Sequence, residues 1–120
     1  MDANWLIVEG RVEHPRGAWS FRDPCLTNFE VNRLARWFDG IADGKPDRNA
    51  CSFIEPNLEF CVAQGMRAIK VRLAHGCGPP WLEARERRQA GTTISFALRD
   101  NDPRTVAASL RELLLAFPER

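Results

Sequence analysis

The chain has 120 residues, of which 44% are hydrophobic and 28% are charged, with 17 lysines and arginines against 16 aspartates and glutamates. This composition indicates one globular domain over residues 1–120, which can bury about two-thirds of the surface that its unfolded form exposes. The net charge of +1 argues against a nonspecific nucleic-acid binder. The longest purely apolar run near the start, Trp5–Val8, is too short for a signal peptide or a membrane span, so we expect a cytoplasmic protein.

The cysteine and histidine content favours free thiols over a disulfide framework or a metal site. We find no secretion signal, and no two of the four cysteines lie in a C-x-x-C or similarly tight ligand spacing. The imidazole ligands on offer are His14 and His75, and His75-Gly76-Cys77 is too tight for a zinc-finger knuckle. We therefore expect no bound metal and no cofactor.

The N-terminal part of the chain predicts a β-hairpin. Apolar and polar side chains alternate along residues 5–13, which is the period of a strand with one buried face. A turn over residues 15–17 leads to a second strand, residues 18–22. We expect this strand to end at Asp23-Pro24, because proline has no N–H to donate to a β-ladder.

A helix is predicted directly after the hairpin. Thr27 and Glu30 have the spacing of a capping box, in which each side chain accepts a hydrogen bond from the backbone N–H of the other residue. Apolar residues then recur at helical intervals, with polar residues on the opposite side. Gly40 offers a left-handed exit, so we expect the helix to end there.

The second half predicts four further strands and a second helix. After a surface loop, the strands are expected over residues 51–55, 58–63, 66–74 and 92–99. Their short connections make most neighbours antiparallel. Asp102 as N-cap and Pro103 in the first turn begin a helix whose apolar stripe reaches Phe117. The order ββαββββα indicates an α+β domain, in which an antiparallel sheet of about six strands carries two helices.

Gly76–Ala90 is the one long segment without an apolar period, and we expect a long loop there, alone or with one helical turn. Trp81, Arg85, Arg87 and Arg88 belong to residue types enriched at binding hot spots, so we place a partner-binding surface on this segment. Interleaved glutamates cancel most of the positive charge, which argues against a nucleic-acid partner. The alternative is that Trp81 packs over the open end of the sheet and belongs to the core.

No catalytic constellation stands out in the sequence. Neither histidine lies in a recognised nucleophile frame. Gly76-Cys77-Gly78 runs into Pro79-Pro80, which removes the N–H donors that a phosphate cradle needs. Glu55 and Glu59 are candidates for a facing acid/base pair, but solvated strand residues or partners for arginine explain them better. We therefore expect a protein without enzymatic activity.

Several short motifs follow one another over nearly the whole chain, and together they resemble the WapI family of bacterial immunity proteins. They are Asp2-Ala3-Asn4-Trp5-Leu6, Asp23-Pro24-Cys25-Leu26-Thr27, Phe53-Ile54-Glu55-Pro56-Asn57-Leu58-Glu59-Phe60, Pro80-Trp81 and Phe117-Pro118. The resemblance implies a non-enzymatic protein that binds and neutralises a cognate toxin domain, of nuclease type in the best-known case.

The start of the chain departs from that family pattern. Similar proteins usually carry one or two further N-terminal strands, so the chain resembles a short member that lacks them. The first strand, Trp5–Glu13, would then have an unpaired edge, through which a homodimer can form. Apart from this second copy, we expect the toxin domain as partner, with no nucleic acid and no membrane.

Two other classes of function stay open on the residues alone. One is a small ligand-binding domain or enzyme with a pocket between sheet and helices. The other is a partner-binding module unrelated to toxins. A toxin gene immediately upstream favours the immunity function, a metabolite bound to the purified protein favours the ligand-binding domain, and an unrelated stable partner favours the third class.

Overall fold

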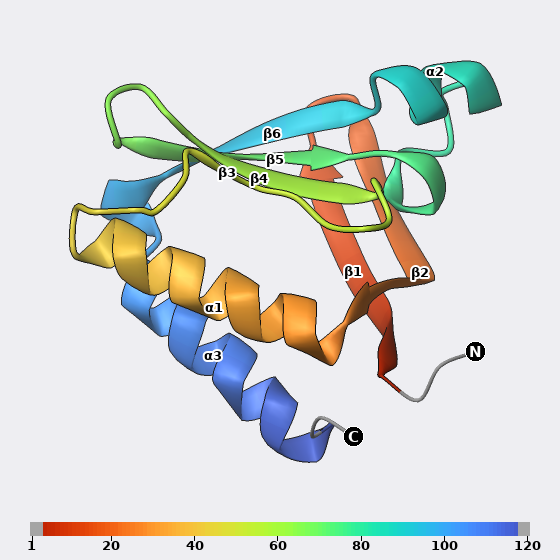
Figure 1. The fold of residues 1–120 in the computed structure, drawn as a ribbon. Helices are drawn as coiled ribbons and strands as arrows, with labels where there is room; N and C mark the ends of the chain where they lie inside the picture. Colours follow the sequence, from red (N-terminus) through yellow and green to blue (C-terminus); the bar gives the residue numbers. More distant parts are fainter. Residues whose placement is uncertain (1–3, 118–120) are drawn as a thin grey trace.

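The computed structural model describes residues 4–117, which form six antiparallel strands and three α-helices (Figure 1). The strands are β1 Trp5–His14, β2 Gly17–Thr27, β3 Ala50–Cys51, β4 Leu58–Ala63, β5 Ala68–Leu73 and β6 Thr92–Ala97. The helices are α1 Asn28–Ala42, α2 Ala84–Gln89 and α3 Pro103–Ala116, with the short 3-10 helices η1 His75–Cys77 and η2 Leu98–Asp100. The predicted α+β class, with six antiparallel strands and two long helices, is confirmed, and α2 adds a short third helix.

The strands divide into two sheets, where we expected one. β1 and β2 pair with each other, while β3, β4, β5 and β6 form a four-stranded sheet in that order. Figure 1 shows α1 and α3 side by side beneath the four-stranded sheet, with the β1–β2 hairpin standing at one end of it. The hairpin joins the rest of the molecule through side-chain contacts and not through strand pairing, so its alternating pattern predicts the strands but not the sheet to which they belong.

The strand β2 continues through the proline at which we expected it to end. Leu6 pairs with Leu26 and Val8 pairs with Asp23, so two residues of β2 lie opposite one residue of β1. Pro24 belongs to this β-bulge. A bulge leaves one residue outside the ladder, so the missing N–H of proline costs no ladder hydrogen bond.

The ends of the two long helices follow their capping residues. The capping box of α1 is confirmed, since Thr27 Oγ1 accepts from the backbone N–H of Glu30 at 3.2 Å. The expected exit at Gly40 is wrong: the helix continues to Ala42, and the left-handed φ of +71° belongs to Gly44. A side chain at Gly40 would instead meet the backbone of the following loop at 3.2 Å. In α3, Asp102 caps the helix as predicted.

The core consists of two buried clusters. One lies between α1, α3 and the four-stranded sheet, and the other joins the hairpin to α1, β4, β5 and η1. The predicted apolar stripe of α3 is only partly buried, because Ala107 alone is fully enclosed while Leu113 and Phe117 remain 59% and 54% exposed. The helix therefore packs on α1 through its first half more completely than through its second.

Trp37 and a group of polar side chains complete the interior. The indole N–H of Trp37 donates to the carbonyl of Arg48 at 2.9 Å.

A group of polar side chains lies where the loop before β4 meets β2 and η1. There the side-chain amide of Asn57 donates to Asp23. The sulfur atoms of Cys25 and Cys77 lie 3.9 Å apart beside it. The hydrogen bond with Cys77 and burial raise the pKa of the Cys25 thiol, while the same hydrogen bond lowers the pKa of the Cys77 thiol.

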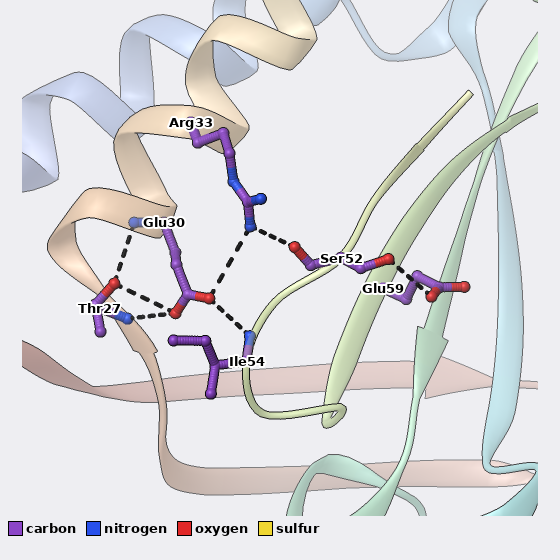
Figure 2. Close-up of polar contacts among 6 residues, drawn as sticks. All are labelled: Thr27, Glu30, Arg33, Ser52, Ile54 and Glu59. Atoms are coloured by element: carbon purple, nitrogen blue, oxygen red, sulfur yellow. Dashed lines mark hydrogen bonds and ion pairs between the residues drawn. The ribbon is translucent and has the colours of Figure 1, made fainter. Parts of the chain in front are cut away.

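A buried carboxylate joins α1 to the loop before β4 (Figure 2). Glu30 is only 7% exposed, and its carboxylate accepts the backbone N–H of Thr27 at 2.9 Å and that of Ile54 at 2.8 Å. The guanidinium of Arg33 lies 4.0 Å from the same carboxylate and donates to the carbonyl of Ser52. These contacts hold residues 52–54 against the helix.

The same contacts explain why β3 is short. We expected a strand over residues 51–55, whereas β3 contains only Ala50 and Cys51. The N–H of Ile54 donates to Glu30, so it is not available to β4.

β5 and β6 are also shorter than predicted. β5 begins only at Ala68, after a turn with left-handed residues, and β6 passes into η2 at Leu98.

Replacing Glu30 with alanine should destabilise the protein more than an ordinary helix-cap substitution. Loss of the cap costs about 1 kcal/mol, and loss of the hydrogen bond from the Ile54 N–H to a charged carboxylate adds about 1.5 to 3 kcal/mol. We therefore expect the free energy of unfolding, measured by urea denaturation, to fall by about 2 to 4 kcal/mol. Glu55→Ala is the matched control, since Glu55 is exposed in the same loop and should change stability by no more than about 0.5 kcal/mol. Equal effects of the two substitutions would contradict this role of Glu30.

Candidate functional site

The segment between β5 and β6 carries the residues that we predicted to bind a partner. It contains η1, a turn and α2, and it lies at the hairpin end of the molecule (Figure 1). η1 packs against β2, and α2 packs against η1. The indole N–H of Trp19 donates to the carbonyl of Cys77 at 2.9 Å, which fixes the start of the segment to the hairpin. The segment is therefore anchored, and it includes more helix than the single turn that we considered.

Trp81 lies over the turn of the hairpin. Its ring meets that of Trp19 edge-on, with the ring centroids 5.2 Å apart and an interplanar angle of 86°. A side-chain carbon at Gly17 would lie 3.1 Å from the Trp81 ring, so this glycine allows the close approach. Trp81 is partly buried. It thus closes the end of the two-stranded sheet while one part of its ring stays accessible.

Arg16 belongs to the same surface and was not predicted to do so. Its guanidinium lies 5.8 Å from the centroid of the Trp81 ring, within the range of a cation–π contact. The backbone N–H of Arg16 donates to His14 Nδ1 at 3.1 Å, and the imidazole lies 6.3 Å from the Trp81 ring. Arg16 and Trp81 are far apart in the chain, so only the fold brings them together.

The three arginines of α2 are available to a partner. Arg85 and Arg88 are exposed, and Arg87 is partly buried because its side-chain stem packs against Gly78. Within residues 4–117 none of the three forms an ion pair with an acidic side chain. Together with Arg16 and Trp81, they form a surface that we call the Trp81 surface.

A second arginine-rich feature was not predicted. A groove of about 490 Å³ between α1 and the loop before β3 is lined by Arg33, Arg36 and Arg48, beside Asp47. Arg33 already bonds to the backbone of Ser52, so it serves the fold. The sequence assigned these residues to the wet side of the helix and to a surface loop, and it held no signal that they share a groove.

The candidate catalytic residues are not brought together. Glu59 accepts a hydrogen bond from Ser52 Oγ at 3.0 Å, whereas Glu55 is exposed in the loop before β4. His14 packs beside Trp19 and Trp81, as the preceding contacts show. Across the described part of the chain, no group of three or more histidine, cysteine or acidic side chains is placed to hold a metal ion. Nor does any helix within residues 4–117 have the length and apolar character to cross a membrane.

The elements described above define a small α+β protein with two antiparallel sheets. The sequence profile of the Immunity protein WapI-like family matches residues 1–118. The chain therefore belongs to the Immunity protein WapI-like family, which confirms the resemblance. Comparisons with curated proteins and with solved structures find no match. Since the family match begins at residue 1, the comparison contradicts our expectation of a shortened member lacking N-terminal strands.

Replacing Trp81 with alanine should lower stability by a moderate amount. Truncation of a fully buried tryptophan to alanine lowers the free energy of unfolding by about 3 to 5 kcal/mol. Because Trp81 is only partly buried, we expect a loss of about 1 to 2 kcal/mol, measured by thermal denaturation. Trp19→Ala is the comparison variant, because Trp19 is 4% exposed and should cost more. An unchanged melting temperature for Trp81→Ala would show that its packing on the hairpin does not stabilise the fold.

Proposed function

We propose that this protein is an immunity protein that binds a cognate bacterial toxin domain through the Trp81 surface and neutralises it without catalysis. Membership of the Immunity protein WapI-like family carries the proposal, because it supplies the class of partner. A toxin of nuclease type is the partner that we infer. An immunity protein needs a rigid scaffold and a complementary surface rather than reactive side chains.

The chemistry of the Trp81 surface supports this role. Tryptophan and arginine are the residue types most enriched at binding hot spots, and Trp81 is held in place by its contacts with Trp19 and Gly17. A side chain that is already ordered loses less conformational entropy when a partner binds. The guanidinium groups of Arg85 and Arg88 match carboxylates, so the toxin face that meets this surface should be acidic.

The thiols support a location in the cytoplasm of the producing cell. All four cysteines are free, although Cys25 and Cys77 lie with their sulfur atoms only 3.9 Å apart. Unbridged cysteines are typical of proteins in a reducing compartment. An immunity protein in the cytoplasm meets an incoming toxin before the toxin reaches its target.

Replacing Arg85, Arg87 and Arg88 together with alanine should weaken binding to the toxin domain encoded beside the immunity gene. Loss of one hot-spot contact reduces the binding free energy by about 2 kcal/mol, so the dissociation constant should be about 30-fold larger. Isothermal titration calorimetry measures this constant. Cells that express this variant should lose protection at a toxin dose that the parent protein withstands. The fold should be intact, because Arg85 and Arg88 are exposed, Arg87 is only partly buried, and exposed substitutions change stability by about 0.5 kcal/mol each.

A second triple variant controls for charge. Arg36→Ala, Arg48→Ala and Arg67→Ala remove the same number of positive charges from exposed positions elsewhere, two of them in the α1 groove. This control should bind the toxin domain as the parent does. If it loses binding while the α2 variant keeps it, the groove and not the Trp81 surface recognises the toxin. If the toxin domain binds none of the proteins, the immunity function itself is wrong.

A further inference from the structure

The strand β1 has one edge that no strand covers. It pairs with β2 along its length, and within residues 4–117 no other strand pairs with it. Its residues alternate between the interior and the solvent, so Ile7, Glu9, Arg11 and Glu13 point outward. Exposed strand edges are normally shortened, covered or given charges that prevent pairing, because their free N–H and C=O groups accept another strand.

Two apolar grooves lie along this edge. One, of about 600 Å³, is lined by every residue of 5–9 together with the second half of α3 and with residues of β2 and the start of α1. The other, of about 510 Å³, lies between the hairpin and the four-stranded sheet; every residue of 10–13 lines it, together with side chains of β2, α1, β4, β5, β6, η2 and the start of α3. Successive residues of a strand point to opposite faces, so a groove that touches all of them borders the backbone edge.

The rims of the grooves carry exposed apolar side chains. Ile7 is 47% exposed, Phe96 is 42% exposed, and Leu113 of α3 and the following Phe117 are more than half exposed. All four belong to the linings of the two grooves. Apolar residues that line an open strand edge on several elements at once indicate a surface that is covered by protein.

We propose that a second copy of this chain covers the edge, with the two β1 strands pairing antiparallel about a two-fold axis at Gly10. The charges along β1 favour a second copy of the same strand as the partner at this edge. In this register residues 6–14 of both copies pair, and Glu9 lies opposite Arg11 of the second copy, twice by symmetry. On the inner face, Val8 lies opposite Val12 of the second copy in the same way.

The existing ion pair extends this complementarity. The carboxylate of Glu9 already lies 2.8 Å from the Arg22 guanidinium on the neighbouring strand β2. In the dimer, one face of the joined sheet therefore carries a row in which Arg22, Glu9 and the second copy's Arg11 alternate in sign. Each of the two rows places opposite charges on neighbouring strands, which is the favourable arrangement of cross-strand pairs.

Other registers of the same two strands are less favourable. A two-fold axis at Glu9 or at Arg11 places that residue opposite its own copy, and the axis at Arg11 also places Glu9 opposite Glu13. An axis at Val12 pairs Arg11 with Glu13, but only residues 10–14 then overlap. Among these registers, the axis at Gly10 pairs opposite charges over the longest overlap.

Pairing in this way also brings the grooves together. A two-fold axis perpendicular to the joined sheet keeps the inner faces of both β1 strands on the same side, so the apolar grooves of the two copies meet across the axis. The Trp81 surface stays free, because α2 packs on η1, which contacts β2 rather than the outer edge of β1. The dimer is therefore compatible with toxin binding and does not depend on it.

Reciprocal charge substitutions test the dimer and its register. Arg11→Glu places two glutamates opposite each other, and Glu9→Arg places two arginines opposite each other, so each variant alone should be a monomer where the parent is a dimer. An equimolar mixture should form a heterodimer, since both cross-strand pairs are then Glu opposite Arg. Sedimentation velocity gives the mass of each sample, and native mass spectrometry separates heterodimer from homodimer.

Glu13→Arg is the matched control. It makes the same change of charge as Glu9→Arg on the same strand, but in the proposed register Glu13 lies opposite Ile7, so this variant should remain a dimer. With the axis at Val12 it would become a monomer instead. Circular dichroism verifies the fold of each variant, and Arg11→Gln and Glu9→Gln replace any variant that is unfolded, with weakened dimers expected from both.

Three results would overturn the proposal. The first is a parent protein that is monomeric at every concentration up to about 1 mM. This result includes the case in which the β1 amides of the monomer become protected from hydrogen exchange only when the toxin domain is added. The second is a dimer that neither Arg11→Glu nor Glu9→Arg weakens. The third is a mixture of these two variants that forms no heterodimer.

Discussion

The carboxylate of Glu30 is the contact on which the arrangement of the hairpin, the helix and the following loop depends. It completes the capping box with Thr27, and it accepts the N–H of Ile54 from a loop far along the chain. Holding that loop on α1 places Asn57 beside Asp23 of β2. The backbone carbonyl of Asn57 accepts from Ala74 at 2.8 Å, directly before η1. One buried carboxylate thus begins a series of polar contacts that leads to the base of the Trp81 surface.

This arrangement explains why most motifs shared with the immunity family lie outside the surface proposed to contact the toxin, with Trp81 of Pro80-Trp81 as the exception. The stretch around Pro24 forms the bulge and the cap of α1, and the stretch around Ile54 forms the loop that Glu30 holds. These residues build the scaffold. The Trp81 surface combines a tryptophan held by that scaffold with arginines of α2 that make no ion pair within the described residues, so under the proposed function these arginines can change without loss of the fold.

Local features of the chain were predictable from the sequence, and long-range ones were not. The capping box at Thr27 and the cap at Asp102 depend on residues three or fewer positions apart, so their spacing is sufficient to find them. The capture of Ile54 by Glu30 depends on the tertiary fold, and it shortened β3 against expectation. For the same reason the arginines of α2 were found by residue type, whereas Arg16 was missed.

Hydrogen exchange of the Ile54 amide tests the role of Glu30 most directly. A backbone N–H in a loop ordinarily exchanges through local opening, at a free energy well below that of global unfolding. If the buried carboxylate holds this loop to α1, the Ile54 amide should exchange only at the rate set by global unfolding, together with the amides in the middle of β4. Exchange of Ile54 as fast as that of the exposed loop residues around Glu55 would contradict the account.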